Sequence, residues 1–326
     1  MHPAFSVIFL TTLIGAGQGL FLALFTGQFY STVELVEPQP ASFYAVGSAL
    51  SLALLVGGLA ASFFHLGRPE RAWRAAAMWR TSWLSREVIV LPAMMGIVFL
   101  YGVFHWAGWT QPFIVLGEGT LPIDATFVLG MLGVLVTLAL FVSTGMIYAS
   151  VKFLQEWHSP YTIANFIFLG TASGFMLAAA YSALLGNHLV GFFGTWAVIA
   201  TLLGLGTRTA SLVRNTSIKH RSNLQTAIGI RHRGIVQKSQ GFSADSFNTR
   251  EFFHHQSPET LKLIRVMFLV LVFPVPIALV LLAYALESPT LPIVAFAVQY
   301  IGLLAERWYF FAEAEHPQNL YYQQIS

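Results

Sequence analysis

The densest group of side chains that can exchange protons lies in a short polar stretch between two long apolar segments. It contains His65 and Glu87, together with Arg68, Arg71 and Trp83. Histidine titrates near neutral pH, and burial can raise the pKa of a glutamate toward neutrality. A His and a Glu at the same depth can therefore exchange two protons with a bound molecule. Each two-electron step of a quinone requires such an exchange.

A structural interpretation of the same residues is also open. His65 can cap the carbonyl groups at the end of its helix, and Glu87 can pair with Arg86 or favour the positive N-terminus of its own helix. Between them, Arg68, Arg71 and Arg74 recur every three residues with several tryptophans nearby, and Pro69 suits the first turn of a helix. This pattern is typical of a helix at the membrane interface, with its aromatic rings at headgroup depth.

The polar stretch belongs to a chain that is too apolar for a soluble enzyme. Hydrophobic residues make up 56% of the 326 residues and charged residues only 10%, where an average soluble domain has about 25% charged residues. Eight apolar segments approach or exceed the roughly 20 residues that a membrane-spanning helix needs, and none has the alternation of a strand. We therefore expect an all-α, polytopic integral membrane protein with eight transmembrane helices, at residues 7–30, 42–65, 87–106, 125–150, 163–185, 188–207, 263–286 and 290–312.

The basic residues are sorted to one side of these eight segments. All 17 Lys and Arg fall in or beside the termini and the even-numbered connections. The opposite connections carry only acidic residues, which are Glu34, Glu37, Glu118, Asp124 and Glu287. The positive-inside rule then places both termini in the cytoplasm. Because a miscounted segment would destroy the sorting, the pattern also supports eight spans.

The chain divides into three parts. Residues 1–207 hold helices one to six, with the candidate site in the hairpin 65–87, and residues 263–326 hold helices seven and eight and the C-terminal tail. Residues 208–262 form a basic, polar segment that is either a flexible cytoplasmic loop or a docking surface for a soluble partner. In the seventh segment, Pro274 and Pro276 remove backbone donors and should kink the helix.

Other cofactors and ligands find less support. The chain has no cysteine, so it has neither disulfides nor a cysteine-held iron–sulfur cluster. Paired histidines can bind haem, and His105 with His188, or His65 with His158, are conceivable pairs. No histidine spacing repeats within one helix, so we predict no haem and no metal site. Nucleic-acid binding is not expected, because topology explains the basic residues.

The sequence resembles the membrane-anchor subunit of dimethyl sulfoxide reductase, within the wider polysulfide-reductase-like anchors. The resemblance covers nearly the whole chain. Its most specific motif is HLGRPERAW at residues 65–73 followed by SWLSRE at residues 82–87. Supporting stretches are MIYAS at 146–150, WHSP at 157–160, GIRHR at 229–233, SFNTREFF at 246–253 and AERWYFF at 305–311.

The resemblance implies an eight-helix anchor in the inner membrane of a bacterium, surrounded by lipid and without a catalytic metal of its own. It implies direct contact with an iron–sulfur subunit and a complex with a molybdopterin catalytic subunit, so the metal cofactors would belong to the partners. Electrons would pass between the iron–sulfur subunit and a quinone, either menaquinone or ubiquinone. In such anchors the His and Glu that match His65 and Glu87 are associated with the quinol site.

The resemblance to the family does not by itself give the direction of electron flow. The long segment 208–262 is similar to the larger branch of the family, which includes anchors of cytoplasm-facing enzymes that oxidise sulfite. We therefore favour sulfite oxidation with quinone reduction over the reverse flow of a dimethyl sulfoxide-type reductase. A membrane transporter is the alternative from another class. Some anchors place a Glu one helical turn before the residue matching Arg307, where this chain has Leu303, so no site role is expected for Glu306.

Overall fold

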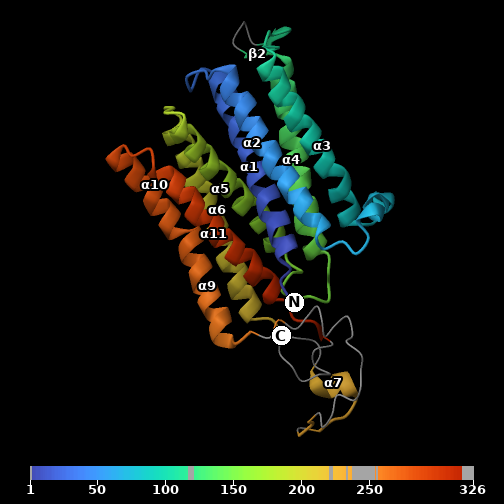
Figure 1. Cartoon of the computed structure of the whole chain (residues 1–326). Helices are drawn as coiled ribbons and strands as arrows, with labels where there is room; N and C mark the ends of the chain where they lie inside the picture. Colours follow the sequence, from blue (N-terminus) through green and yellow to red (C-terminus); the bar gives the residue numbers. More distant parts are fainter. Residues whose placement is uncertain are drawn as a thin grey trace.

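Long helices run side by side through most of the molecule (Figure 1). The computed structural model describes residues 2–116, 121–219, 223–232, 234–236, 254 and 256–317. Within these residues, seven helical segments are long and apolar enough to cross a membrane. The long helices are α1 Phe5–Thr32, α2 Ala41–Phe63, α3 Trp83–Trp106, α4 Ala125–Ala149, α5 Pro160–Leu184, α6 Val190–Thr216, α9 Pro258–Val272, α10 Pro274–Leu286 and α11 Leu291–Ala312.

Short elements occupy the connections. A 3-10 helix, η1, spans Pro69–Met78, and a single turn, α7, spans Leu224–Ile228. The connection between α3 and α4 forms an antiparallel hairpin of β1 Ile114–Leu116 and β2 Leu121–Ile123, in which Ile114 pairs with Ile123. The expectation of a purely helical chain is wrong for this hairpin, because strands of three residues are too short to show an alternating pattern.

Short polar residues fix where several helices begin. The side chain of Ser82 accepts a hydrogen bond from the backbone of Ser85 at the start of α3, and Asp124 does the same for Phe127 at the start of α4. Ser159 caps α5 in the same way. These caps satisfy backbone N–H groups that have no partner inside the helix. They set the depth at which the first turns of α3 and α4 lie.

Helices α1 and α5 form the centre of the bundle, and two thirds of the apolar window of each is buried. α1 packs against α2, α4, α5 and α11, while α5 packs against α4, α6 and α11 as well. Gly19 and Gly174 allow the two backbones to touch, since a Cβ atom added to Gly174 would overlap the carbonyl carbon of Gly19. Small residues at such a crossing permit the close packing on which helix association in membranes depends.

The proline pair breaks the seventh segment as the sequence predicts. α9 ends at Val272 and α10 begins at Pro274, with Phe273 between them at φ −110° and ψ −78°. The basic segment 208–262 is shorter than expected, because α6 continues to Thr216 and α9 begins at Pro258. The stretch 246–253 and Arg233 of the stretch 229–233 lie outside the described residues.

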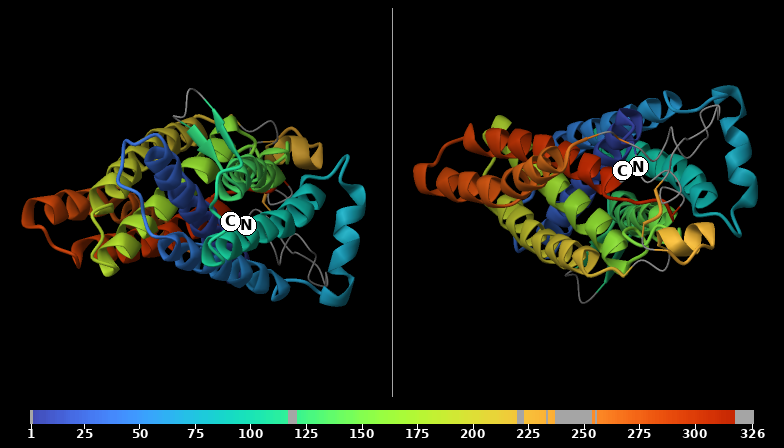
Figure 2. Two further views of the ribbon diagram at one scale, coloured as in Figure 1. Left: turned by 90° about the horizontal axis from the view of Figure 1, so that it is seen from above. Right: turned by 90° about the horizontal axis from the view of Figure 1, so that it is seen from below.

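The N-terminal end of α1 and the C-terminal end of α11 lie at the same end of the bundle (Figure 1). Ile8 of α1 shares a buried apolar cluster with Phe310 and Phe311 of α11. The helix η1 lies near this end and stands away from the bundle, as the end views of Figure 2 show. Its Trp73 is 72% exposed, which fits the predicted position of an interfacial helix.

Candidate functional site

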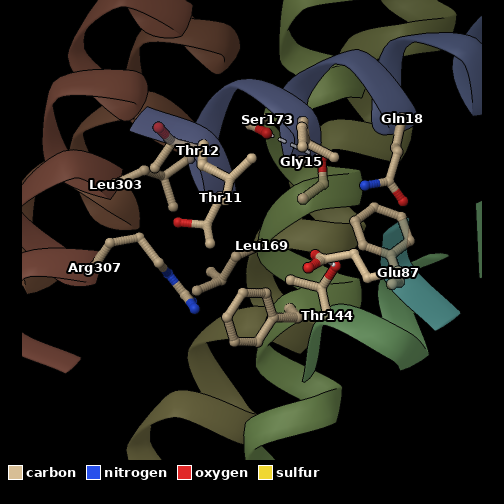
Figure 3. Close-up of a pocket in the computed structure, with 15 residues that line it drawn as sticks. Thr11, Thr12, Gly15, Gln18, Glu87, Thr144, Leu169, Ser173, Leu303 and Arg307 are labelled. Atoms are coloured by element: carbon tan, nitrogen blue, oxygen red, sulfur yellow. Dashed lines mark hydrogen bonds between the residues drawn. The ribbon is translucent and has the colours of Figure 1, made fainter. Parts of the chain in front are cut away.

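A pocket lies between five helices of the bundle (Figure 3). The space open to the centres of water molecules inside it is about 30 Å³. Its lining residues come from α1, α3, α4, α5 and α11, and the polar ones are Thr11, Thr12, Gln18, Glu87, Thr144, Ser173 and Arg307. Polar and ionisable side chains inside the membrane are costly and usually mark a functional site, so this polar pocket is the candidate site.

Glu87 enters this pocket from the first turns of α3. The Ser82 cap begins the helix five residues earlier, and the Glu87 side chain turns inward, leaving the residue only 8% exposed. The hydroxyl of Thr144 on α4 donates a hydrogen bond of 2.5 Å to Oε1 of Glu87. A carboxyl group in this position is costly unless it has a partner or a function.

Arg307 enters the pocket from the opposite side, on α11 (Figure 3). Its Nε lies 2.6 Å from Oε2 of Glu306, and its guanidinium carbon lies 4.2 Å from the ring centre of Phe166. The ion pair and the ring together hold the planar guanidinium in one orientation. The NH1 atom of Arg307 is buried and has no hydrogen-bond partner among the described residues.

A buried ionic cluster stands behind Arg307. Nε of Arg208 on α6 lies 2.8 Å from Oε1 of Glu306, and NH1 of Arg208 lies 3.7 Å from Oε2 of Glu313. Arg208, Glu306 and Arg307 are all less than 5% exposed. One carboxylate thus bridges two arginines from two helices.

This cluster was not expected from the sequence, in which Arg208 falls in the basic loop and Glu306 has no site role. The spacing of four residues along α11 could have revealed part of this cluster from the sequence. Gln299, Leu303, Glu306 and Phe310 follow one another at the spacing of a single helix face, and all four are buried on α11. This buried polar face also explains why α11 falls outside the seven strongly apolar segments.

The other predicted site residues lie outside the pocket. His65, Arg68 and Arg71 lie in the connection after α2 and in the first turn of η1, and they are not among the residues that line the pocket. Partial burial lowers the pKa of His65 below its ordinary value. Trp83 is half-buried one helical turn before Glu87 and packs against Arg86, whose guanidinium carbon lies 4.0 Å from its ring centre.

Of the predicted site residues, the structure places Glu87 in the lining of the pocket. Trp83 precedes Glu87 by one turn of α3 but does not line the pocket. The predicted pair of His65 and Glu87 therefore does not share this pocket.

Three of the four histidines considered as haem ligands lie against other groups of the protein. His158 Nδ1 lies 2.6 Å from the carbonyl oxygen of Ala149. His188 lies beside Glu37 and Gln39 at the opposite end of the bundle. His105 is buried and stacks on Tyr44 with ring centres 4.6 Å apart. In the part of the chain that the structure describes, no three His, Asp or Glu side chains are grouped to hold a metal ion.

Comparison with known proteins agrees with the motifs around this site. Residues 1–312 match the family described as DMSO reductase anchor subunit (DmsC). The chain is also 64% identical, over the full length of both proteins, to a sulfite dehydrogenase subunit of Allochromatium vinosum. Both similarities include the segment that holds His65, Glu87 and Arg307. The chain therefore belongs to the family of dimethyl sulfoxide reductase anchor subunits.

Proposed function

We propose that this chain is the quinone-reactive membrane anchor of a complex that oxidises sulfite and reduces quinone. Membership of the anchor family supports association with a molybdopterin catalytic subunit and an iron–sulfur subunit. The full-length similarity to a sulfite dehydrogenase subunit supports sulfite as the electron donor. The chain itself would carry no molybdenum site, and its role would be to bind the quinone and to supply protons.

The observation that carries the proposal is the buried carboxyl group of Glu87. It lines the polar pocket near the start of α3, where it accepts a hydrogen bond from Thr144. Reduction of a quinone to a quinol takes up two electrons and two protons. A residue that donates these protons must contact the ring oxygens on one side and a proton supply on the other.

The pocket is too small to hold a quinone ring, because 30 Å³ accommodates about two water molecules. The ring would therefore bind on the outer side of Glu87, under the hairpin. Trp83 offers an aromatic face there, His65 a second proton-exchanging group, and Arg68 and Arg71 positive charge for the ring oxygens or for acidic residues of a partner. The exposed Trp73 of η1 and Trp79, which follows η1, would lie at headgroup depth and place this opening where a lipid-soluble quinone can enter.

We further propose that α11 is an eighth transmembrane helix and that both termini are cytoplasmic. α11 has 22 residues, enough to span the apolar core. It returns the chain to the end of the bundle at which α1 begins (Figure 1), which requires an even number of crossings. Its buried Gln299, Glu306 and Arg307 face neighbouring helices and not lipid.

The arrangement also favours a side for the partners. The arginines of η1, Lys152 and the basic segment after α6 all belong to connections at the end where α1 begins, and the positive-inside rule makes that end cytoplasmic. An iron–sulfur subunit would dock on this face of the bacterial inner membrane, because its terminal cluster must come close to the quinone. The part of the predicted basic segment that lies between α6 and α9 would contribute to the docking surface.

Purification of the tagged chain from its native membrane tests the proposal. The anchor should bring down two larger soluble subunits, and the complex should reduce a quinone analogue when sulfite is added. A chain that purifies alone would support the transporter alternative. A complex that does not oxidise sulfite, but oxidises a quinol analogue with dimethyl sulfoxide as the acceptor, would support electron flow from quinol to the catalytic subunit. The name of the matched family favours this direction.

A further inference from the structure

The pocket behind Glu87 contains polar atoms that the protein itself does not satisfy. Oε1 of Gln18 on α1 and NH1 of Arg307 on α11 are both buried without a hydrogen-bond partner in the described chain. Both residues line the same 30 Å³ cavity. One atom is an acceptor and the other a donor, so a water molecule can satisfy either.

The hydroxyl groups that line the cavity already donate to other groups of the protein. The hydroxyl of Thr11 donates to the carbonyl of Val7 at 2.9 Å, and that of Ser173 donates to the carbonyl of Gly170 at 2.9 Å. Each keeps lone pairs that can accept from water. The cavity therefore offers one orphaned donor, one orphaned acceptor and several spare acceptors around a space for about two water molecules.

The charges around Glu87 are fixed by packing. Arg307 is held by Glu306 and by the ring of Phe166, and Glu306 is held in turn by Arg208. Tyr148, one turn after Thr144 on α4, is close enough to interact electrostatically with both Glu87 and Arg307. A fixed guanidinium orients neighbouring water molecules with their oxygens toward it and their hydrogens away from it.

We propose that two water molecules fill this cavity and form the inner proton route to Glu87, between Arg307 and Gln18. The inference rests on the proposed function, because it assumes that Glu87 gives protons to a quinone bound on its outer side. When Glu87 donates a proton outward, the nearer cavity water gives Glu87 a proton from within. That water then takes a proton from its neighbour, and the neighbour takes one from solvent water through the open side of the pocket. Glu306 positions Arg307, and Arg307 and Gln18 position the water.

The variant that tests this route is Gln18→Leu in the intact complex. Leucine is similar in volume and stable in an apolar helix, but it removes the acceptor that holds the inner water. We expect turnover with sulfite and a quinone analogue to fall about tenfold per assembled complex, and the solvent deuterium isotope effect to rise. The apparent affinity for the quinone analogue should stay within about twofold, since Gln18 does not face the outer site.

Gln28→Leu is the matched control on the same helix. Gln28 is also a buried glutamine, but it accepts a hydrogen bond from Tyr101 and donates one to Thr126, away from the cavity. The control substitution costs the fold at least as much as Gln18→Leu, but it leaves the route intact, so turnover per assembled complex should stay near wild type. Equal turnover of the two variants would overturn the route.

A direct structural measurement separates the route from the proposed function. A cryo-electron microscopy map of the wild-type complex at a resolution that shows water should contain two water peaks within hydrogen-bond distance of Gln18 Oε1, Arg307 NH1 or Glu87. A dry cavity in a complex that reduces quinone would overturn the route alone. Water in the cavity of a complex that does not react with quinone would overturn the proposed function and, with it, any role of that water in quinone reduction.

Discussion

Thr144 of α4 donates a hydrogen bond of 2.5 Å to Glu87 of α3, inside the polar pocket that both residues line. The two residues are 57 positions apart in the chain. Their contact exists because α3 and α4 pack against each other as neighbours, with each helix start fixed by its own cap. A hydroxyl in this place orients the carboxyl group and supports one of its two oxygens.

Replacing Glu87 with Gln should leave the complex assembled and lower quinone-linked turnover at least about 100-fold, as expected for loss of a general acid or base. The amide keeps the shape and can still accept from Thr144, but it cannot exchange a proton. The measurement is sulfite-dependent reduction of a quinone analogue per assembled complex. Glu34→Gln, at an exposed position on the opposite side, is the control, and wild-type turnover in Glu87→Gln would refute the proton role.

Replacing Thr144 with Val should have a smaller effect. Valine keeps the volume but removes the hydroxyl, so the Glu87 carboxyl group loses its orientation. We expect turnover to fall about tenfold, which corresponds to roughly 1.4 kcal/mol. Thr137→Val on the same helix is the matched control, because Thr137 donates to the sulfur of Met94 and does not line the pocket. Similar losses in both variants would mean that α4 packing, and not Glu87, is affected.

Replacing Glu306 with Gln should destabilise the protein. The change leaves Arg208 and Arg307 buried without the carboxylate that bridges them, and removing one partner of a buried ion pair costs about 3–5 kcal/mol. Thermal unfolding of the purified complex should therefore begin at a clearly lower temperature. Glu70→Gln breaks only the exposed contact with Arg71 at 3.8 Å, which is worth less than about 1 kcal/mol. An equal Tm for both variants would contradict the structural role of the buried cluster.

Replacing Gly174 with Ala should separate α1 from α5. The added methyl group would overlap the backbone of Gly19, and backbone atoms cannot move aside as a flexible side chain can. We expect little assembled complex in the membrane, measured by immunodetection of the anchor and its partners. Gly96→Ala on α3 is the control, since a Cβ atom there meets nothing within 4 Å. Normal assembly of Gly174→Ala would show that the two helices do not touch.

The lowered pKa of His65 leads to a prediction about pH. Desolvation disfavours the charged ring, so His65 is neutral at pH 7 and becomes protonated only below its ordinary value of about 6.5. As a proton donor to quinone, it should raise turnover as the pH falls below about 6.5. His65→Gln should abolish this rise, as seen in pH–rate profiles of both proteins. The unfolded chain binds the proton first, so His65 also makes the fold slightly less stable as pH falls through that window.

The sequence by itself determined the class of the protein and most of its long apolar helices, and it singled out Glu87 as a candidate residue. Apolar runs of this length have few alternatives to helices in a bilayer, because every backbone polar group must be satisfied within the segment. The proline pair specified the break at Phe273 because proline removes backbone donors. Glu87 could be singled out because a carboxyl group near an apolar helix is costly and therefore informative.

Only the tertiary structure decided which residues share a pocket with Glu87. Thr144, Gln18 and Arg307 come from three other helices, and nothing in their spacing along the chain indicates a common cavity. In the sequence, Arg208 belongs to a basic loop. In the structure, α6 continues past Arg208, and the Arg208 side chain lies against Glu306. The physical reason is that the rotation and register of packed helices depend on close contacts such as Gly19 with Gly174. Such contacts are a property of the assembled bundle and not of any one segment.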